Sequence, residues 1–324
     1  QLIPGSNKAI GKGGNSYVDD FEGSISLIDL RNQGAWSLAS IPQNQPNVFP
    51  ESNLSDDITT GVNRALLNWY TIDPLFYNKT DNLTPNYYND NNWFSNNYTR
   101  QIIESNLFPN KQPPNNQPVN MPALSLTFYP EERGPYNYET TAIPGISAGW
   151  NLSTQKLANP TSRWGGIMRR LETNDFQAAN IEAIQIFVMD PFDGDYSIVH
   201  GPNLPTSGDL YFDLGNISED IIKDGSMSYE NGLPIDASNS TAVNTNENNL
   251  AVIPVVPPII NAFDVNESSR PFQDIGFDGM NNAKEASKYQ NYLAWVNQNL
   301  PTLASEIGND PAADDYHFYR GDDY

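Results

Sequence analysis

The sequence predicts a mainly β fold, an antiparallel β-sandwich of jelly-roll type followed by a small, partly helical C-terminal segment. Three observations favour it. Short runs of alternating apolar and polar residues recur along the chain, as in half-buried strands. Asp-Pro, Asp-Gly and Ser-Gly turns separate these runs, as in sandwiches and jelly rolls. Hydrophobic residues make up 38% of the 324 residues, enough for a buried core. We expect residues 1–240 to form the sandwich with long loops, and residues 241–324 to contain a linker, a calcium-type loop and a helix.

Several segments of the predicted sandwich have the pattern of strands. They are Ser16–Ile28, Ala35–Ala39, Ala123–Tyr129, Trp164–Leu171, Ile181–Met189 and Asp209–Leu214. Thr59–Tyr70 fits either a short helix or a strand, because its periodicity does not distinguish the two. Large apolar side chains in these runs are expected to make the core contacts. They are Trp36, Trp164, Ile184, Ile186, Phe187 and Phe212.

Helical structure is predicted at three places. Tyr98–Leu107 is a possible helix, and Ile217–Asp224 suits a helical turn. Lys284–Leu300 is the best patterned, because its apolar and aromatic residues recur at the spacing of one helix face. These residues are Tyr289, Tyr292, Leu293, Val296 and Leu300.

The charge of the chain excludes some classes of partner. It has 17 basic and 39 acidic residues, and its net charge is −22. Nucleic-acid binding needs clustered Lys and Arg side chains, which this composition does not offer. The same charge disfavours docking on an anionic lipid surface. No run approaches the roughly 18 apolar residues of a membrane helix, so we expect no membrane span.

The residues that many enzymes use for catalysis are scarce. The chain has no cysteine, and its histidines are His200 and His317. A multi-histidine zinc site, a thiol nucleophile and a Gly-x-Ser-x-Gly elbow are therefore excluded. Pairs of carboxylates are frequent, but a chain this acidic produces them by chance. We expect a protein that is not an enzyme.

One segment, Asp274–Glu285, has the spacing of a calcium loop. An EF-hand loop places oxygen ligands at positions 1, 3, 5, 7, 9 and 12 and a glycine at position 6. Gly279 stands at position 6 here. The predicted calcium ligands are Asp274, Asp278, the carbonyl of Met280, Asn282 and Glu285.

Position 3 of this loop departs from the pattern, because Gly276 offers no side-chain ligand. A water or a carboxylate of the acidic tail, such as Asp314 or Asp315, would have to replace it. No entering helix is expected, because Pro271 stands just before the loop. With one carboxylate fewer than a high-affinity loop, calcium binding should be weak, roughly of the 10⁻⁴–10⁻³ M class. The alternative is a glycine-rich turn without a metal.

Several strings of residues resemble one family when they are read in order. They are Val18–Ser24, Trp36–Ser40, Tyr129–Tyr138, Arg163–Thr173, Ile181–Phe192, Gly208–Asp220, Asp274–Gly279 and Asp315–Gly321. Together they are similar to the SprA (Sov) family of gliding-motility proteins, the outer-membrane translocon of the type IX secretion system. The similarity extends over nearly the whole chain, from about Val18 to Tyr324.

The resemblance implies a role in protein export to the cell surface. Members of the family form a giant outer-membrane β-barrel, which needs many strands that alternate between lipid-facing and lumen-facing residues. This chain has too few such strands, so we expect a soluble and extracellular portion of the translocon at the outer membrane or cell surface. Its expected partners are other subunits of the translocon and exported cargo proteins.

An alternative interpretation of the sequence is that the chain is a carbohydrate-binding module of a secreted surface protein. The strings Asp19–Gly23 and Gly208–Gly215 separately resemble the galactose-binding-like jelly roll of such modules, an analogy of fold only. The aromatic segment Tyr87–Phe94 suits a sugar-stacking platform, or else a loop that folds over the sandwich as a small core. Both readings stay open at the level of the sequence.

Overall fold

The computed structural model describes residues 28–42, 44–54, 58–77, 100–111, 119–171, 175–178, 183–192, 207–215, 243–245, 251–254 and 264–316. Residues 97, 115, 117, 173, 181, 221, 228 and 233 are described singly. The expected strand Ser16–Ile28 (except Ile28), the expected turn Ile217–Asp224 (except Ile221) and the aromatic segment Tyr87–Phe94 lie outside the described residues.

The chain divides into two compact units, and each unit is assembled from segments that are distant in sequence. Unit 1 contains residues 1–36, 70–125 and 169–210, and unit 2 contains residues 37–69, 126–168 and 211–324. The C-terminal segment therefore belongs to the same unit as two earlier stretches of β structure.

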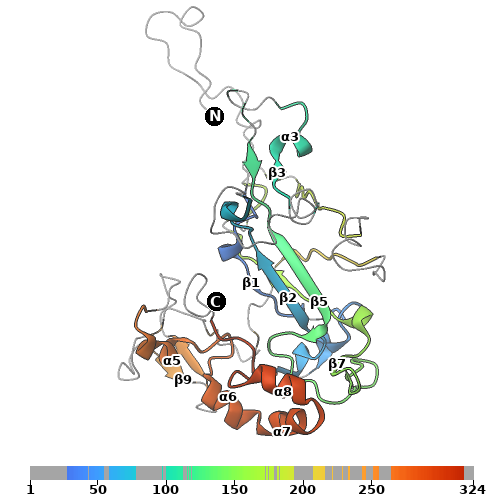
Figure 1. The fold of residues 1–324 in the computed structure, drawn as a ribbon, viewed down its shortest axis with the longest axis vertical. Helices are drawn as coiled ribbons and strands as arrows, with labels where there is room; N and C mark the ends of the chain where they lie inside the picture. Colours follow the sequence, from blue (N-terminus) through green and yellow to red (C-terminus); the bar gives the residue numbers. More distant parts are fainter. Residues whose placement is uncertain are drawn as a thin grey trace, which may run out of the picture. The chain divides into compact units, whose positions relative to one another are not determined.

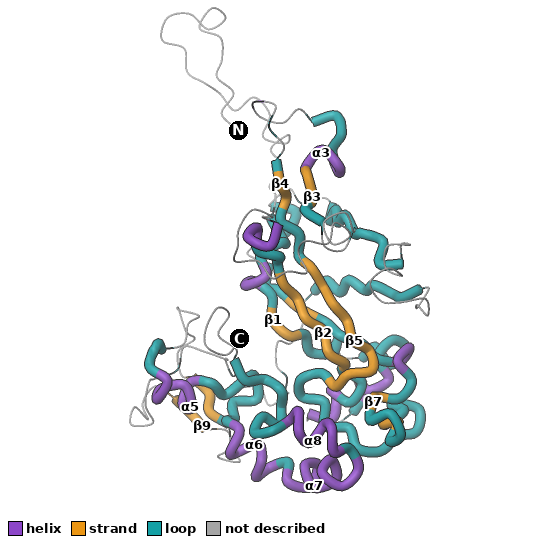
Figure 2. Tube along the Cα trace, viewed as in Figure 1, coloured by secondary structure: helices purple, strands orange, loops and turns teal. Residues whose placement is uncertain are grey.

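The strands in the described residues are short and are paired two by two (Figures 1 and 2). The pairs are β1 with β8, β2 with β5, β3 with β4, β6 with β7, and β9 with β10. The pairs β1–β8, β3–β4, β6–β7 and β9–β10 are antiparallel; for example, Leu38 of β1 lies opposite Ile167 of β8. The strands are β1 (Ser37–Leu38), β2 (Ala65–Tyr70), β3 (Ile102–Ile103), β4 (Asn120–Met121), β5 (Ser125–Arg133), β6 (Trp150–Asn151), β7 (Lys156–Leu157), β8 (Ile167–Met168), β9 (Val243–Thr245) and β10 (Val252–Pro254). The expectation of short antiparallel strands is confirmed in these small sheets.

The helices are short, and four of the five α-helices in the described residues lie after residue 264 (Figure 2). The α-helices are α3 (Glu104–Leu107), α5 (Arg270–Gln273), α6 (Asn282–Lys288), α7 (Gln290–Asn299) and α8 (Pro301–Ile307). The 3-10 helices are η1 (Gln33–Ala35), η2 (Pro50–Asn53), η3 (Ile58–Gly61), η4 (Pro74–Tyr77), η7 (Pro160–Ser162) and η8 (Glu267–Ser269). None of these described helices has the length and apolarity needed to cross a bilayer.

The ambiguous segment 59–70 contains both kinds of structure. Its first residues belong to η3, and its second half is β2. The aromatic pair Trp69–Tyr70 at the end of β2 favours a strand. The expected strand Ala123–Tyr129 is confirmed as β5, which continues to Arg133. In the possible helix at 98–107, the last four residues form α3 and residues 100–103 are not helical; residues 98 and 99 lie outside the described residues.

Two expected strands, Ile181–Met189 and Asp209–Leu214, are not formed among the described residues. Residues 183–190 and 209–214 have no strand partner among the described residues and lie without regular structure. The expected core residues within them are exposed for the same reason: Ile184, Ile186, Phe187 and Phe212. Trp36 and Trp164 are only partly buried. An alternating pattern makes a strand only when a partner strand supplies its hydrogen bonds, and the pattern cannot show that partner.

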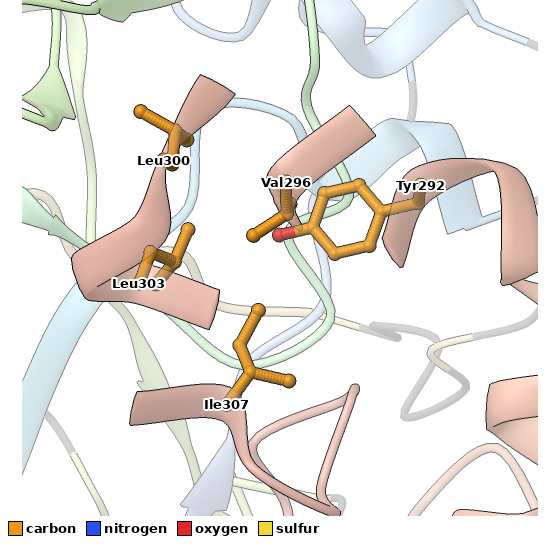
Figure 3. Close-up of a cluster of buried hydrophobic side chains, with 5 residues drawn as sticks. All are labelled: Tyr292, Val296, Leu300, Leu303 and Ile307. Atoms are coloured by element: carbon orange, nitrogen blue, oxygen red, sulfur yellow. The ribbon is translucent and has the colours of Figure 1, made fainter. Parts of the chain in front are cut away.

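The apolar core of the helical part lies between α7 and α8. Figure 3 shows its five buried side chains: Tyr292, Val296, Leu300, Leu303 and Ile307. The expected single helix at 284–300 is broken at Tyr289 into α6 and α7, and Pro301 begins α8. Proline suits the first turn of a helix, because the amide it lacks has no partner there.

The interior around the end of β5 is polar. Arg163 and Glu139 form a fully buried ion pair of 2.6 Å. Arg163 also donates to the carbonyls of Val62 and Gly149 at 2.9 and 2.8 Å, and Glu139 accepts the amide of Gly149 at 2.8 Å. Asn137 donates its side-chain amide to the Arg64 carbonyl at 2.7 Å. Charged groups are tolerated inside a protein only when they are paired in this way.

Candidate metal centre

The loop between α5 and α6 is held in shape by two glycines. Gly276 and Gly279 have φ angles of +54° and +74°, in the left-handed region that favours glycine. The amide of Val252 in β10 donates to the Gly279 carbonyl at 2.7 Å. A β-carbon on Gly279 would lie 2.7 Å from the Val252 carbonyl oxygen, so only glycine lets the loop approach the strand this closely.

Three carboxyl groups converge at this loop. Asp278 lies in the loop, Glu285 in α6 and Asp314 in the C-terminal tail. Carboxylate oxygens of all three lie within 4.8 Å of one another. Asp278 is 1% exposed and Glu285 is 0% exposed. We call this set the carboxylate triad.

Each of the two fully buried carboxylates leaves one oxygen without a hydrogen bond. Asp278 accepts the Met280 amide at 2.9 Å through Oδ1, while its Oδ2 has no hydrogen-bond partner. Glu285 accepts the Ala312 amide at 3.0 Å through Oε2, while its Oε1 has none. The ion pairs found among the described residues do not include the triad. Burying a carboxylate oxygen without a partner costs free energy. Both oxygens can therefore accept a hydrogen bond from a further donor or bind a cation.

The electrostatics of the triad disfavour three negative charges at once. Burial raises the pKa of Asp278 to about 7. Burial, followed by the charge of Asp278, raises the pKa of Glu285 to about 9. Burial and the charge of Glu285 hold the pKa of Asp314 well above its ordinary value. Without a counter-charge, these groups retain protons that isolated carboxyl groups would lose.

Gly276 makes room for the third carboxylate. A β-carbon at this position would overlap Asp314 Oδ2 and lie 2.5 Å from the Tyr136 hydroxyl. Asp314 therefore occupies the space beside Gly276, which stands at position 3 of the predicted calcium loop. Asp314 is one of the two tail residues expected to replace the missing ligand at that position.

Tyr136 connects this site to the β structure. Its hydroxyl donates to Asp314 Oδ2 at 2.6 Å and accepts the Phe277 amide at 2.6 Å. Its own amide donates to the Ala312 carbonyl at 2.8 Å. Tyr136 is fully buried and has a φ of +56°, which is strained for a bulky side chain. These bonds compensate for the strain and hold the tail beside the loop.

A second group of carboxylates borders the triad. Carboxylate oxygens of Asp310, Asp314 and Asp315 also lie within 4.8 Å of one another. Asp310 accepts the amides of Ala313 and Asp315 at 2.7 and 3.2 Å. Asp310 therefore shapes the turn that presents Asp314.

The other predicted ligands lie beside the triad. Asp274 accepts the Tyr316 amide at 3.2 Å, and Asn282 donates to Asp315 at 3.0 Å. Met280 is buried, and its amide is bonded to Asp278. The loop thus brings together Asp278 and Glu285 of the five predicted residues.

The expectation that no helix precedes the loop is wrong. The four-residue helix α5 ends at Gln273, directly before Asp274. Pro271 lies in its first turn, where proline is compatible with a helix.

Tyr136 and Asp310 were not among the predicted site residues. The sequence distance between Tyr136 and Asp314 is 178 residues, and no local pattern encodes a contact of that range. The pair Gly134-Pro135, which favours a turn, is a local signal next to Tyr136.

The donor set of the triad consists of oxygen atoms. Calcium and magnesium prefer carboxylate and carbonyl oxygens, whereas zinc and copper select sulfur and nitrogen ligands. The triad therefore suits a hard divalent cation. Asp278 lies between the partly buried Phe277 and the fully buried Met280 in the sequence of the loop.

A pocket of about 440 Å³ lies elsewhere in unit 2, beside β7. Its lining contains no aromatic side chain on which a sugar ring would stack. It lends no support to the carbohydrate-binding reading.

The chain matches no protein-family model and no curated protein. The resemblance to the SprA family therefore rests on the sequence strings alone.

Proposed function

We propose that this chain is a non-catalytic portion of the type IX secretion translocon, located outside the membrane at the surface of the outer membrane. It serves protein export to the cell surface and gliding motility by shaping the mouth of the export channel. Its partners are other translocon subunits and exported cargo proteins. The proposal is motivated by the order of family strings along nearly the whole chain.

The observation that carries the proposal is the exposure of two apolar segments. In residues 183–190, Ile186 is 42% exposed and Val188 is 61% exposed. In residues 209–214, Tyr211 and Phe212 are 59% and 60% exposed. Contiguous exposed apolar residues mark surfaces that another protein segment covers. A portion of a larger β assembly would leave such segments open when it is separated from the assembly.

The same observation bears on the finer fold. We propose that residues 183–190 and 209–214 are strands of a jelly-roll sandwich of the galactose-binding-like type, which pair only within the assembled translocon. Both sides of residues 184–189 are exposed, as expected for a strand that neighbours would cover on both faces. Alternating residues would then contribute to two different apolar layers.

The test uses the full-length export protein that carries this chain. The double substitution Ile186→Ser with Val188→Ser changes one face of the first segment, because residues two apart point the same way in a strand. Surface display of exported proteins should be lost while the protein still accumulates. Val265→Ser is the matched control, since Val265 is 93% exposed outside both segments.

Normal display with the double variant would refute the proposal. Binding of a defined sugar by the isolated chain, measured on a glycan array and by calorimetry, would instead favour the carbohydrate-binding module. A translocon portion should bind none.

A further inference from the structure

We propose that Asp278, Glu285 and Asp314 bind a calcium ion, which fastens the C-terminal tail to the loop between α5 and α6. This inference is independent of the role in export. It also differs from an EF-hand, because one ligand comes from a tail residue and replaces a ligand of the loop itself.

The first argument is that two buried carboxyl oxygens of the triad have no hydrogen-bond partner. Asp278 and Glu285 are buried, and each has an oxygen without a hydrogen bond. Asp314 brings a third carboxylate to within 4.8 Å. Among the described residues no ion pair reaches these groups. A divalent cation would supply the missing counter-charge and would be coordinated by oxygens of all three carboxylates.

The second argument is that the backbone is shaped for this convergence. Gly276 leaves the space that Asp314 occupies. Tyr136 holds Asp314 through a hydrogen bond of 2.6 Å, and Glu285 holds the tail through the amide of Ala312. The carboxylates are thus positioned by their own partners before any ion arrives, which reduces the cost of ordering them on binding.

The choice of calcium follows from the ligands. They are oxygens from three separate segments of the chain, a loop, a helix and a tail. Calcium accepts six to eight oxygens in a flexible arrangement, whereas magnesium requires a near-ideal octahedron. Neighbouring carbonyl groups and waters would complete the coordination sphere.

The consequence is a calcium-dependent attachment of the tail. The tail residues Pro311 and Ala312 are also bound by the β structure: Arg133 donates to the Pro311 carbonyl at 2.5 Å, and Tyr136 donates to the Ala312 carbonyl. An ion in the triad would therefore link α6, the loop and the end of β5 through one short stretch of tail.

The experiment is a calcium titration of the 324-residue chain after removal of metals by chelator. Calorimetry measures the binding heat, and circular dichroism measures the melting temperature. At calcium about a hundredfold above its Kd, the melting temperature should rise by roughly 5–10 °C. Chelator should reverse the rise, and magnesium at the same concentration should give a smaller one.

The substitutions Asp278→Asn and Glu285→Gln keep the shape of each side chain and remove its charge. Both variants should lose the calcium-induced rise. Glu306→Gln is the control, because Glu306 is exposed on α8 of the same unit, and it should retain the full rise.

A wild-type chain that gives no binding heat and no change in melting temperature would overturn the proposal, and so would a Glu285→Gln variant with the full response. An equal rise with magnesium would overturn the choice of calcium. If either variant fails to fold, terbium luminescence of the wild-type chain decides the matter. Terbium emission, excited through the tyrosine next to the triad, should appear when terbium binds. It should disappear when calcium displaces the terbium ion. Absence of the emission contradicts the site.

Discussion

At the scale of single residues, the site depends on one missing side chain. Gly276 occupies a left-handed conformation and has no room for a β-carbon, because Asp314 fills that space. Gly145 also has a left-handed conformation, with a φ of +74°, but no atom lies within 4 Å of a β-carbon placed there. Alanine substitutions at the two positions therefore distinguish the cost of backbone strain alone from the cost of strain together with steric overlap.

Gly276→Ala should lower the free energy of unfolding by about 2–5 kcal/mol, the sum of left-handed strain and overpacking. Gly145→Ala should cost only the strain, about 1–2 kcal/mol. Urea denaturation of both variants measures the difference. Equal losses would mean that Asp314 moves away without cost, and hence that its position is not fixed.

The buried ion pair between Arg163 and Glu139 provides a second test at this scale. Glu139→Gln preserves the shape of the side chain but leaves the Arg163 charge buried without its partner. The loss of stability should be about 3–5 kcal/mol, visible as a lower urea midpoint.

Glu132→Gln is the matched control, because Glu132 pairs with Lys156 at 2.7 Å while both side chains remain almost half exposed. Solvent screens such a pair, so its loss should cost less than about 1 kcal/mol. A Glu139→Gln variant as stable as this control would show that the buried pair contributes nothing.

At the scale of elements, the sequence pattern predicted the helix and the loop whose structure depends on residues close together in the chain. β5 was predicted because its alternating residues suit a half-buried strand, and α7 because its apolar residues share one face. Asp278 and Glu285 were predicted from the spacing of the loop. For α7 and the loop the deciding interactions lie within a few residues, whereas β5 also depends on its pairing with the distant strand β2.

The elements that depend on distant partners were not predictable in the same way. Residues 183–190 have a strand-like pattern, but a strand also needs a partner, and the described residues supply none. The hydrogen bond between Arg133 and the Pro311 carbonyl joins residues 178 positions apart. The break at Tyr289 depends on packing, since Tyr289 stacks on Tyr138 with ring centroids 3.9 Å apart.

The core between α7 and α8 gives a prediction for these elements. Val296 is 1% exposed and contributes to that core. Val296→Ala should cost about 1–3 kcal/mol, because buried methyl groups are lost and a cavity remains. Gln298→Ala, on the exposed side of the same helix, should change stability by less than about 0.5 kcal/mol.

Chemical denaturation followed by circular dichroism measures both variants. If the two helix substitutions had equal effects, α7 would not be held by its apolar face. Its intrinsic helix propensity would not replace that packing, because a ten-residue helix is marginal in water.

At the scale of the whole molecule, the chain combines a net charge of −22 with a polar interior and exposed apolar segments. The charge opposes compaction by self-repulsion, and a calcium ion bound to the triad would reduce it. The exposed apolar segments are the part of the surface that the proposed assembly would cover.

Hydrogen exchange of the amides of residues 183–190 tests the central claim most directly, when it is compared between the isolated chain and the assembled translocon. The amides should exchange rapidly in the isolated chain, because they form no strand there. In the translocon they should become protected as partner strands pair with them. Protection in the isolated chain, or rapid exchange in both states, would contradict the account.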